Sequence, residues 1–151
     1  MICSKEKVSR LQSGSLHVTQ KVDYGLFLLS VLARHAESKN PKMPSISKIA
    51  GDHHLSFSFL QKVAHTLKRE GFIRSHRGKD GGYTLVKNPK VILLKEVIES
   101  LEGPIAAPTC FEEASHACPR KSFCAIRAGF ERMNSEIAGL YLSKTLSDFL
   151  S

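Results

Sequence analysis

The chain has 151 residues, of which 42% are hydrophobic and 24% charged, so it has the length and apolar content to fold around a core. It contains no stretch of roughly 18 consecutive apolar residues, which a membrane-spanning helix needs, and its polar N-terminus has no apolar segment typical of a secretory signal. These features exclude integral membrane proteins and large multidomain enzymes. They predict a cytoplasmic protein that does not bind membranes.

The whole chain has a formal net charge of +8, and its basic residues are concentrated in the first part of the sequence. Residues 1–90 contain 16 basic and 6 acidic side chains, whereas residues 91–151 contain 6 basic and 8 acidic ones. The alternative is an ordinary solvated surface, but so uneven a distribution favours a nucleic-acid-binding face on the first part alone.

Signals typical of helices follow one another between residues 17 and 71. Residues 1–16 are polar and without periodicity, which predicts a flexible extension. Apolar spacing and capping residues predict one helix over 19–37, a short helix over 45–51, and a third helix that begins at Ser56 or Ser58 and stops at Gly71. Two short helices joined by a tight turn are typical of a helix-turn-helix.

A basic hairpin is predicted next, with strands at 72–76 and 83–86 around a glycine-rich turn. A further short helix over 94–101 ends at Gly103. The order of elements predicts a mainly α fold with a small β-hairpin, a winged helix-turn-helix that occupies residues 17–103.

The remainder of the chain is predicted to be a cysteine-containing loop over 104–124 and a helical region over 125–151. Its long helix, ending near residue 142, carries apolar residues in steps of four and three, which is a heptad seam. We expect the seam to make this a dimerisation helix; packing within the chain is the alternative. Capping-box spacing at Thr145 predicts a short final helix.

A recognition helix presents its N-terminal side chains to base edges in the major groove. The candidates for this role are Ser56, Ser58, Phe59, Gln61 and Lys62. The wing residues Arg77 and Lys79 suit the electronegative minor groove. The candidates for phosphate contacts are Lys48, Lys68, Arg69 and Arg74. As alternatives, Phe57 or Phe59 packs in the core and the basic residues are merely solvated.

Three cysteines, Cys110, Cys118 and Cys124, lie within fifteen residues of one another. Thiolates bind zinc, copper(I) and iron, but structural zinc sites favour CxxC pairs, which are absent here. The spacing therefore favours an iron–sulfur cluster, 4Fe–4S or 2Fe–2S, that takes a further ligand from elsewhere, over zinc or inert thiols. Asp23 and His116 have the chemistry of a fourth ligand.

No catalytic constellation is visible, so we expect a protein that is not an enzyme. The glycine-rich turn lies between two strands and does not open a helix, unlike a phosphate-binding loop. Alternatives to a cluster-controlled DNA-binding regulator are a regulator that uses its cysteines for thiol redox or zinc, a small electron-transfer protein, and a cluster-assembly factor.

Over residues 16–151 the chain resembles the Rrf family of iron–sulfur winged-helix regulators, which includes IscR-like and NsrR-like members. The resemblance rests on Val22-Asp23-Tyr24-Gly25-Leu26, on Leu55 to Lys62, on Arg77-Gly78-Lys79-Asp80-Gly81-Gly82-Tyr83, on Leu101 to Ile105, on the three cysteines, and on Thr145 to Leu150.

The resemblance implies a homodimer that binds inverted-repeat promoter DNA and holds a cluster through the three cysteines, whose gain or loss switches DNA binding. NsrR-like members have the Cys-x-x-Arg pattern found at Cys124 and Arg127, and their fourth ligand is an aspartate of the partner subunit, matching Asp23. The segment Glu102-Gly103-Pro104-Ile105 is similar to the corresponding segment of the subgroup that regulates cluster assembly. The implied role is a repressor that senses cluster or iron status, nitric oxide or oxidative stress.

Overall fold

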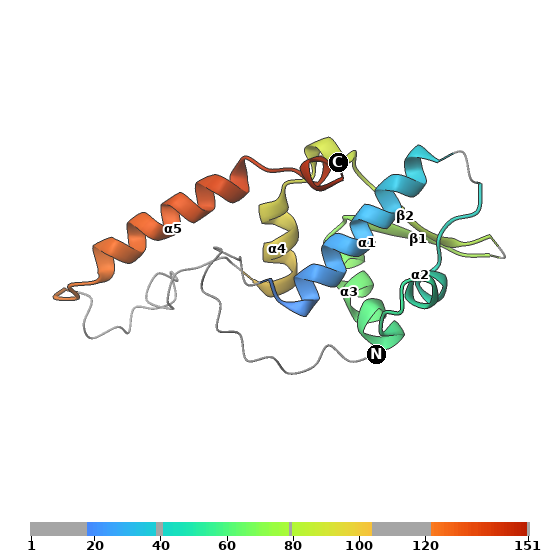
Figure 1. Cartoon of the computed structure of the whole chain (residues 1–151), viewed down its shortest axis with the longest axis horizontal. Helices are drawn as coiled ribbons and strands as arrows, with labels where there is room; N and C mark the ends of the chain where they lie inside the picture. Colours follow the sequence, from blue (N-terminus) through green and yellow to red (C-terminus); the bar gives the residue numbers. More distant parts are fainter. Residues whose placement is uncertain (1–17, 39–40, 79, 104–121, 151) are drawn as a thin grey trace.

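A computed structural model describes residues 18–38, 41–78, 80–103 and 122–150, without the side chains of residues 138 and 140–142. Figure 1 shows the order of the elements, which are α1 (Gln20–Glu37), α2 (Ile46–Asp52), α3 (Phe57–Arg69), β1 (Ile73–His76), β2 (Gly82–Leu85), η1 (Pro89–Val91), α4 (Leu94–Glu102), α5 (Arg127–Leu142) and η3 (Leu146–Phe149). Helices, helix-turn-helix and hairpin therefore occur in the predicted order, and the predicted winged-helix fold is confirmed.

The first three helices each begin at a hydroxyl residue that caps the helix. The side chains of Thr19, Ser45 and Ser56 accept hydrogen bonds from the backbone N–H groups of the third residue after each of them. Such caps satisfy backbone donors that have no partner inside the helix. Past the end of α3, Gly71 has φ +78°, a conformation that glycine adopts at little cost.

Strands β1 and β2 form a two-stranded antiparallel sheet, in which Ile73 pairs with Leu85 and His76 with Gly82. This hairpin is held against the segment before α2. The Tyr83 N–H donates to the Pro44 carbonyl at 3.0 Å, and a Cβ at Gly82 would lie 2.6 Å from the same oxygen. Glycine at this position therefore permits the close approach that fixes the wing beside the helix-turn-helix.

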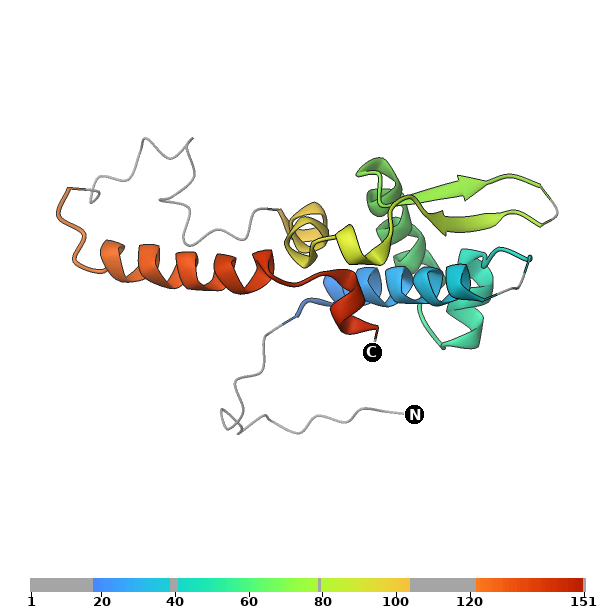
Figure 2. The same ribbon diagram turned by 90° about the horizontal axis from the view of Figure 1, so that it is seen from above.

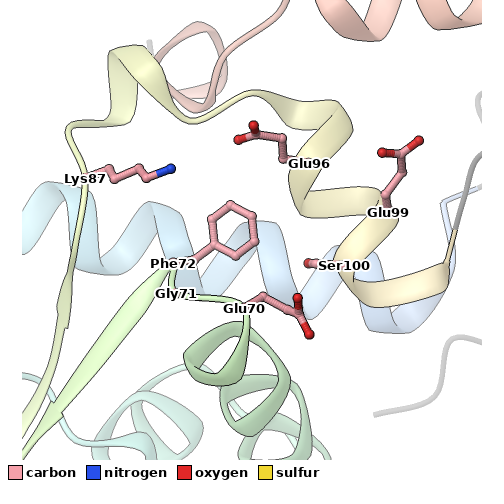
Figure 3. Close-up of a pocket in the computed structure, with 7 residues that line it drawn as sticks. All are labelled: Glu70, Gly71, Phe72, Lys87, Glu96, Glu99 and Ser100. Carbon is pink, nitrogen blue, oxygen red and sulfur yellow. The ribbon is translucent and has the colours of Figure 1, made fainter.

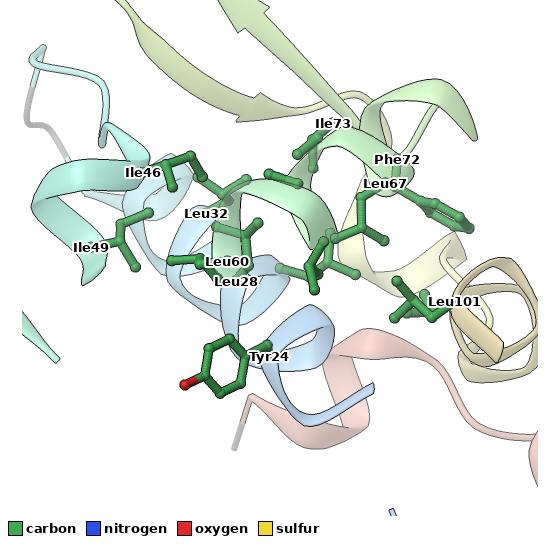
Figure 4. Packing of buried hydrophobic residues seen from close by; sticks show 14 of the residues in the cluster. Tyr24, Leu28, Leu32, Ile46, Ile49, Leu60, Leu67, Phe72, Ile73 and Leu101 are labelled. Atoms are coloured by element: carbon green, nitrogen blue, oxygen red, sulfur yellow. The ribbon is translucent and has the colours of Figure 1, made fainter. Parts of the chain in front are cut away.

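The core lies around α1, which contacts α3, α4 and β2. Its central side chains are aliphatic and fully buried; Leu28, Leu29, Leu60, Val63 and Leu67 are at most 1% exposed. Figure 4 shows Tyr24 at the edge of this cluster, with its hydroxyl directed away from the aliphatic side chains. Among the described residues, no polar or charged residue is buried.

The end of the chain returns to the winged helix. Leu94 N–H donates to the Lys144 carbonyl at 3.0 Å, and Leu146 N–H donates to the Ile92 carbonyl at 2.8 Å. The Leu146 side chain is completely buried in the main core. The last turn, which was expected to belong with the dimerisation helix in residues 125–151, thus packs on the DNA-binding domain.

The capping box predicted at Thr145 is present at the start of η3. The Thr145 backbone N–H donates to Asp148 Oδ2 at 2.7 Å, and its hydroxyl donates to the same oxygen at 3.0 Å. These two hydrogen bonds lower the pKa of Asp148 below its ordinary value because both favour the ionised carboxylate. The backbone hydrogen bond has the larger effect and the hydroxyl the smaller one.

Helix α5 and the hairpin project from opposite ends of the molecule, as Figures 1 and 2 show. The α5 helix meets the body near α4. Met133 on α5 is 45% exposed, and Ile126, directly before the helix, is 65% exposed. None of the described helices combines the length and the apolarity needed to cross a membrane.

Candidate nucleic-acid interface and cysteine site

Helix α3 has one face in the core and one face in solvent. Leu60, Val63, Ala64 and Leu67 are at most 1% exposed and pack against α1 and α4. The opposite face presents exposed side chains that can donate and accept hydrogen bonds, namely Ser58, Gln61, Lys62, His65 and Lys68. Polar and basic side chains on one face of the second helix of a helix-turn-helix are the arrangement that reads base edges.

The two phenylalanines at the start of α3 lie in different surroundings. Phe57 is 48% exposed. Phe59, which we expected at the DNA surface, packs against the core and contacts the Tyr24 ring edge to face, with ring centroids 5.0 Å apart. Phe59 is half-buried, so its predicted DNA contact stays a prediction, and Phe57 is the more exposed of the two apolar side chains at this end of α3.

Ser56 is the N-cap of α3, so its hydroxyl already serves the helix. Its Oγ accepts from Phe59 N–H at 3.4 Å and lies 3.3 Å from Ser58 Oγ. Ser58 itself is exposed. Phe57 and His65 were not among the residues expected at base edges. His65 could have been found from its spacing, because it lies four residues after Gln61 on the solvent face.

All four residues predicted to contact phosphates are exposed. Lys48 is exposed on α2, Arg74 is exposed on β1, and Lys68 is exposed near the end of α3. Arg69 forms an exposed salt bridge with Glu70 at 2.9 Å. A phosphate would have to compete with that carboxylate, so we assign more of the phosphate contact to Lys68 than to Arg69.

Arg77 is exposed where the hairpin turn begins. The turn itself is built by glycines: Gly78 has φ +117°, and Gly81 N–H donates to the Gly78 carbonyl at 3.0 Å. A Cβ at Gly81 would lie 2.4 Å from the His76 carbonyl oxygen. This narrow turn places Arg77 at the tip of the wing, while Lys79 lies outside the described residues.

Of the predicted cluster ligands, Cys124 and Asp23 are described. Cys124 is a free, half-exposed thiol three residues before α5 begins. Asp23 is exposed in the first turn of α1. Cys110, Cys118 and His116 lie outside the described residues. No set of three or more potential metal-ligating side chains comes together within the described ranges.

Within one chain, Cys124 lies before the outer end of α5, whereas Asp23 lies in the body of the molecule, in the first turn of α1. Cys124 precedes α5, whose beginning points away from the winged helix in Figures 1 and 2, whereas α1 starts beside α4. The 16 residues of α5 correspond to a length of about 24 Å. The donor set, thiolates with one carboxylate, suits iron, and this separation favours an aspartate from a second copy of the chain.

A hollow of about 390 Å³ lies between the end of α3, the strand ends and α4. Figure 3 shows its lining, which includes the carboxylates of Glu70, Glu96 and Glu99 and the ammonium group of Lys87. Its acidic lining repels phosphate, so the hollow does not belong to the nucleic-acid interface.

Comparison with known proteins points in the same direction as the geometry. The family model "Rrf2: Iron-dependent Transcriptional regulator" matches residues 18–151. An Rrf2-like HTH-type transcriptional regulator of Rhodobacter capsulatus is 31% identical over 138 residues, which are 89% of this chain and 92% of the relative. The HTH-type transcriptional regulator NsrR of Shouchella clausii is 30% identical over 112 residues, 74% of this chain and 73% of the relative.

The fold is also found among solved structures. The structure of CymR, described as the global cysteine regulator of B. subtilis, has a TM-score of 0.68 and 28% sequence identity to this chain. The similarity covers 90% of this chain and 97% of CymR.

Proposed function

Since this chain belongs to the Rrf2 family of DNA-binding transcription regulators, we propose that an iron–sulfur cluster controls its affinity for DNA. The proposal rests on the presence, in one chain, of a helix suited to DNA and a group of cysteines suited to a metal cluster. A solvent-facing, basic recognition helix lies in the same chain as three closely spaced cysteines, one of which is a free thiol at the start of a protruding helix. We propose a cytoplasmic repressor with no enzymatic activity.

In the proposed DNA complex, α3 lies in the major groove. Ser58, Gln61 and Lys62 contact base edges, and Phe57 packs on a thymine methyl. Arg77 and Lys79 enter the minor groove. A·T-rich sequence narrows this groove and makes it more electronegative. Ser56 holds the start of the helix, and the phosphate contacts come from Lys48, Lys68, Arg69 and Arg74.

Cys110, Cys118 and Cys124 would hold a 4Fe–4S or 2Fe–2S cluster, with the partner subunit's Asp23 as the fourth ligand. When bound, the cluster would supply iron–ligand bonds that join the cysteine segment of one subunit to α1 of the other. Aspartate is a harder ligand than thiolate and holds iron less firmly. This weaker attachment suits a sensor of iron or cluster status, nitric oxide or oxidative stress.

We propose a homodimer that binds an inverted-repeat promoter site. The apolar seam that runs from Ile126, directly before α5, to the exposed Met133 on the helix is the surface through which two copies would pair. Two-fold symmetry of the protein then requires two half-sites of the DNA in opposite orientation.

The proposal is tested by purifying the protein without oxygen and measuring iron and acid-labile sulfide per chain, with the visible absorption spectrum. We expect matched iron and sulfide in the wild-type protein and in the Cys3→Ser control, which changes the one cysteine outside the trio. The Cys124→Ser and Asp23→Ala proteins should lose part or all of the cluster. Protein without iron and sulfide after reconstitution would refute cluster control.

A second candidate is a regulator of the same fold whose cysteines respond as thiols, without a cluster. It is favoured by the free, half-exposed Cys124 thiol. It predicts protein without iron whose DNA affinity changes when thiol oxidants are added and returns when a reductant is added.

A further inference from the structure

The start of the recognition helix lacks half of its cap. Ser56 Oγ accepts from Phe59 N–H, as a helix N-cap does. In a complete capping box, the side chain three residues later would accept from the N-cap backbone N–H in return. At the start of α3 that residue is Phe59, which has no acceptor. In the same chain, Asp148 makes this return bond to Thr145.

Tyr24, from another helix, supplies the missing acceptor. The Ser56 backbone N–H donates to the Tyr24 hydroxyl at 3.3 Å. The ring of Tyr24 also packs edge to face on Phe59, with an interplanar angle of 88°. Tyr24 is 8% exposed, so one buried side chain of α1 contacts both the cap and the third residue of α3.

The turn of α1 that carries Tyr24 is fixed on its other side to the end of α4. The Thr19 hydroxyl donates to Glu102 Oε1 at 2.7 Å, and the Lys21 ammonium group donates to the Leu101 carbonyl. Gly25 packs against the Leu101 side chain. The chain leaves α4 at Gly103 toward the cysteines, and Asp23, the proposed carboxylate ligand, directly precedes Tyr24.

We propose that Tyr24 is a positioning residue that couples the ligand-bearing first turn of α1 to the start of the recognition helix, an inference that rests on the proposed cluster control. Asp23 and Tyr24 are consecutive residues of one helix, so a pull on the Asp23 carboxylate displaces the Tyr24 backbone as well. The bond to Ser56 is already at the long end of the hydrogen-bond range, and a small displacement decides whether it forms. Cluster occupancy would thereby alter the position of the base-reading end of α3.

The test uses the full-length Tyr24→Phe protein, which keeps the ring and loses only the acceptor. The matched control is Ser30→Ala, which removes a hydroxyl hydrogen bond of α1 that stays within that helix, from Ser30 to the Phe27 carbonyl. A duplex selected by the wild-type protein from a randomised DNA pool serves as the probe. Its dissociation constant is measured with cluster-loaded and cluster-free protein of each variant, together with iron and sulfide content.

We expect Tyr24→Phe to bind iron and sulfide as the wild type does, but to show a ratio of the two dissociation constants about fivefold closer to one, the value of one net hydrogen bond. Ser30→Ala should keep the wild-type ratio. In cluster-free protein, the Ser56 amide hydrogen should exchange faster in Tyr24→Phe than in the wild type. An unchanged ratio, or unchanged exchange at Ser56, would overturn the proposal.

Two further outcomes also decide the matter. Equal losses of DNA affinity and of thermal stability in Tyr24→Phe and Ser30→Ala would indicate a general effect on α1 and overturn the coupling role. A wild-type protein that binds DNA equally well with and without iron would refute cluster control itself. The coupling would then fail too, and faster exchange at Ser56 would show only that Tyr24 completes the α3 cap.

Discussion

At the scale of single residues, Gly25 marks the tightest approach between α1 and α4. A Cβ at Gly25 would lie 2.4 Å from Leu101 Cδ1. Leu101 is 2% exposed, so its side chain is surrounded by other core atoms and has little room to rotate away. The glycine therefore sets how closely the two helices pack.

We expect Gly25→Ala to lower the free energy of unfolding by about 1 kcal/mol, because the strain of overpacking exceeds the helix propensity that alanine gains. The control is Gly51→Ala in α2, where a Cβ would meet no atom within 4 Å; it should raise the free energy of unfolding by up to about 1 kcal/mol. Urea denaturation measures both. A stabilised Gly25→Ala protein would mean that α1 and α4 separate at little cost.

Residues with local roles were predictable from the sequence, and residues with distant partners were not. Ser56 is a cap because of the residues that immediately follow it. Phe57 and Phe59 both lie at helical spacing from the buried residues of α3, but Phe59 contacts Tyr24, more than thirty positions away, and is half-buried, whereas Phe57 is exposed. The link from Tyr24 to Ser56 has the same long-range origin.

At the scale of elements, the proposed DNA complex assigns base contacts to α3 and a minor-groove contact to the basic wing. Arg77→Ala should weaken binding because it removes a minor-groove contact, most strongly on A·T-rich sites. Lys68→Ala should lower affinity on every sequence and reduce the slope of affinity against salt by about one. Lys144→Ala, outside α2, α3 and the hairpin, is the control and should bind normally. Unchanged salt slopes and affinities for both variants would rule out the assigned surface.

The main elements could be predicted because their ends carry local signals, such as Thr19, Ser45 and Gly71. The single turn η1 (Pro89–Val91) was not expected, since three residues are too few to show helical periodicity. Nor could the sequence reveal that residues 144–146 return to the backbone near Ile92, because that pairing joins segments about fifty residues apart.

At the scale of the whole molecule, the protruding α5 determines which assembly is possible. We expect Met133→Glu, which puts a charge in the apolar seam, to convert the proposed dimer to a monomer while the winged helix keeps its thermal stability. Arg132→Glu, at a neighbouring exposed position outside the seam, is the control and should remain dimeric. Sedimentation velocity distinguishes the two. A dimeric Met133→Glu protein would place the contact elsewhere, and a monomeric wild type would refute the homodimer.

The C-terminal turn should contribute to the stability of the DNA-binding domain. Leu146 is completely buried, so Leu146→Ala should lower the free energy of unfolding by about 2–5 kcal/mol. Phe149, three residues later, is 58% exposed, and Phe149→Ala should change it by less than about 1 kcal/mol. Similar effects of the two substitutions would show that η3 detaches in solution.

The return of the chain at Thr145 also determines what a protease could accomplish. The pairing of Leu93 with Thr145 and the buried Leu146 hold the C-terminal segment on the winged helix independently of the connection that follows Gly103. A single cleavage between Gly103 and Arg127 would therefore produce two fragments that stay together as one particle. Covalent continuity between the α4 end and α5 would be lost, but the long helix would remain attached to the body that reads DNA.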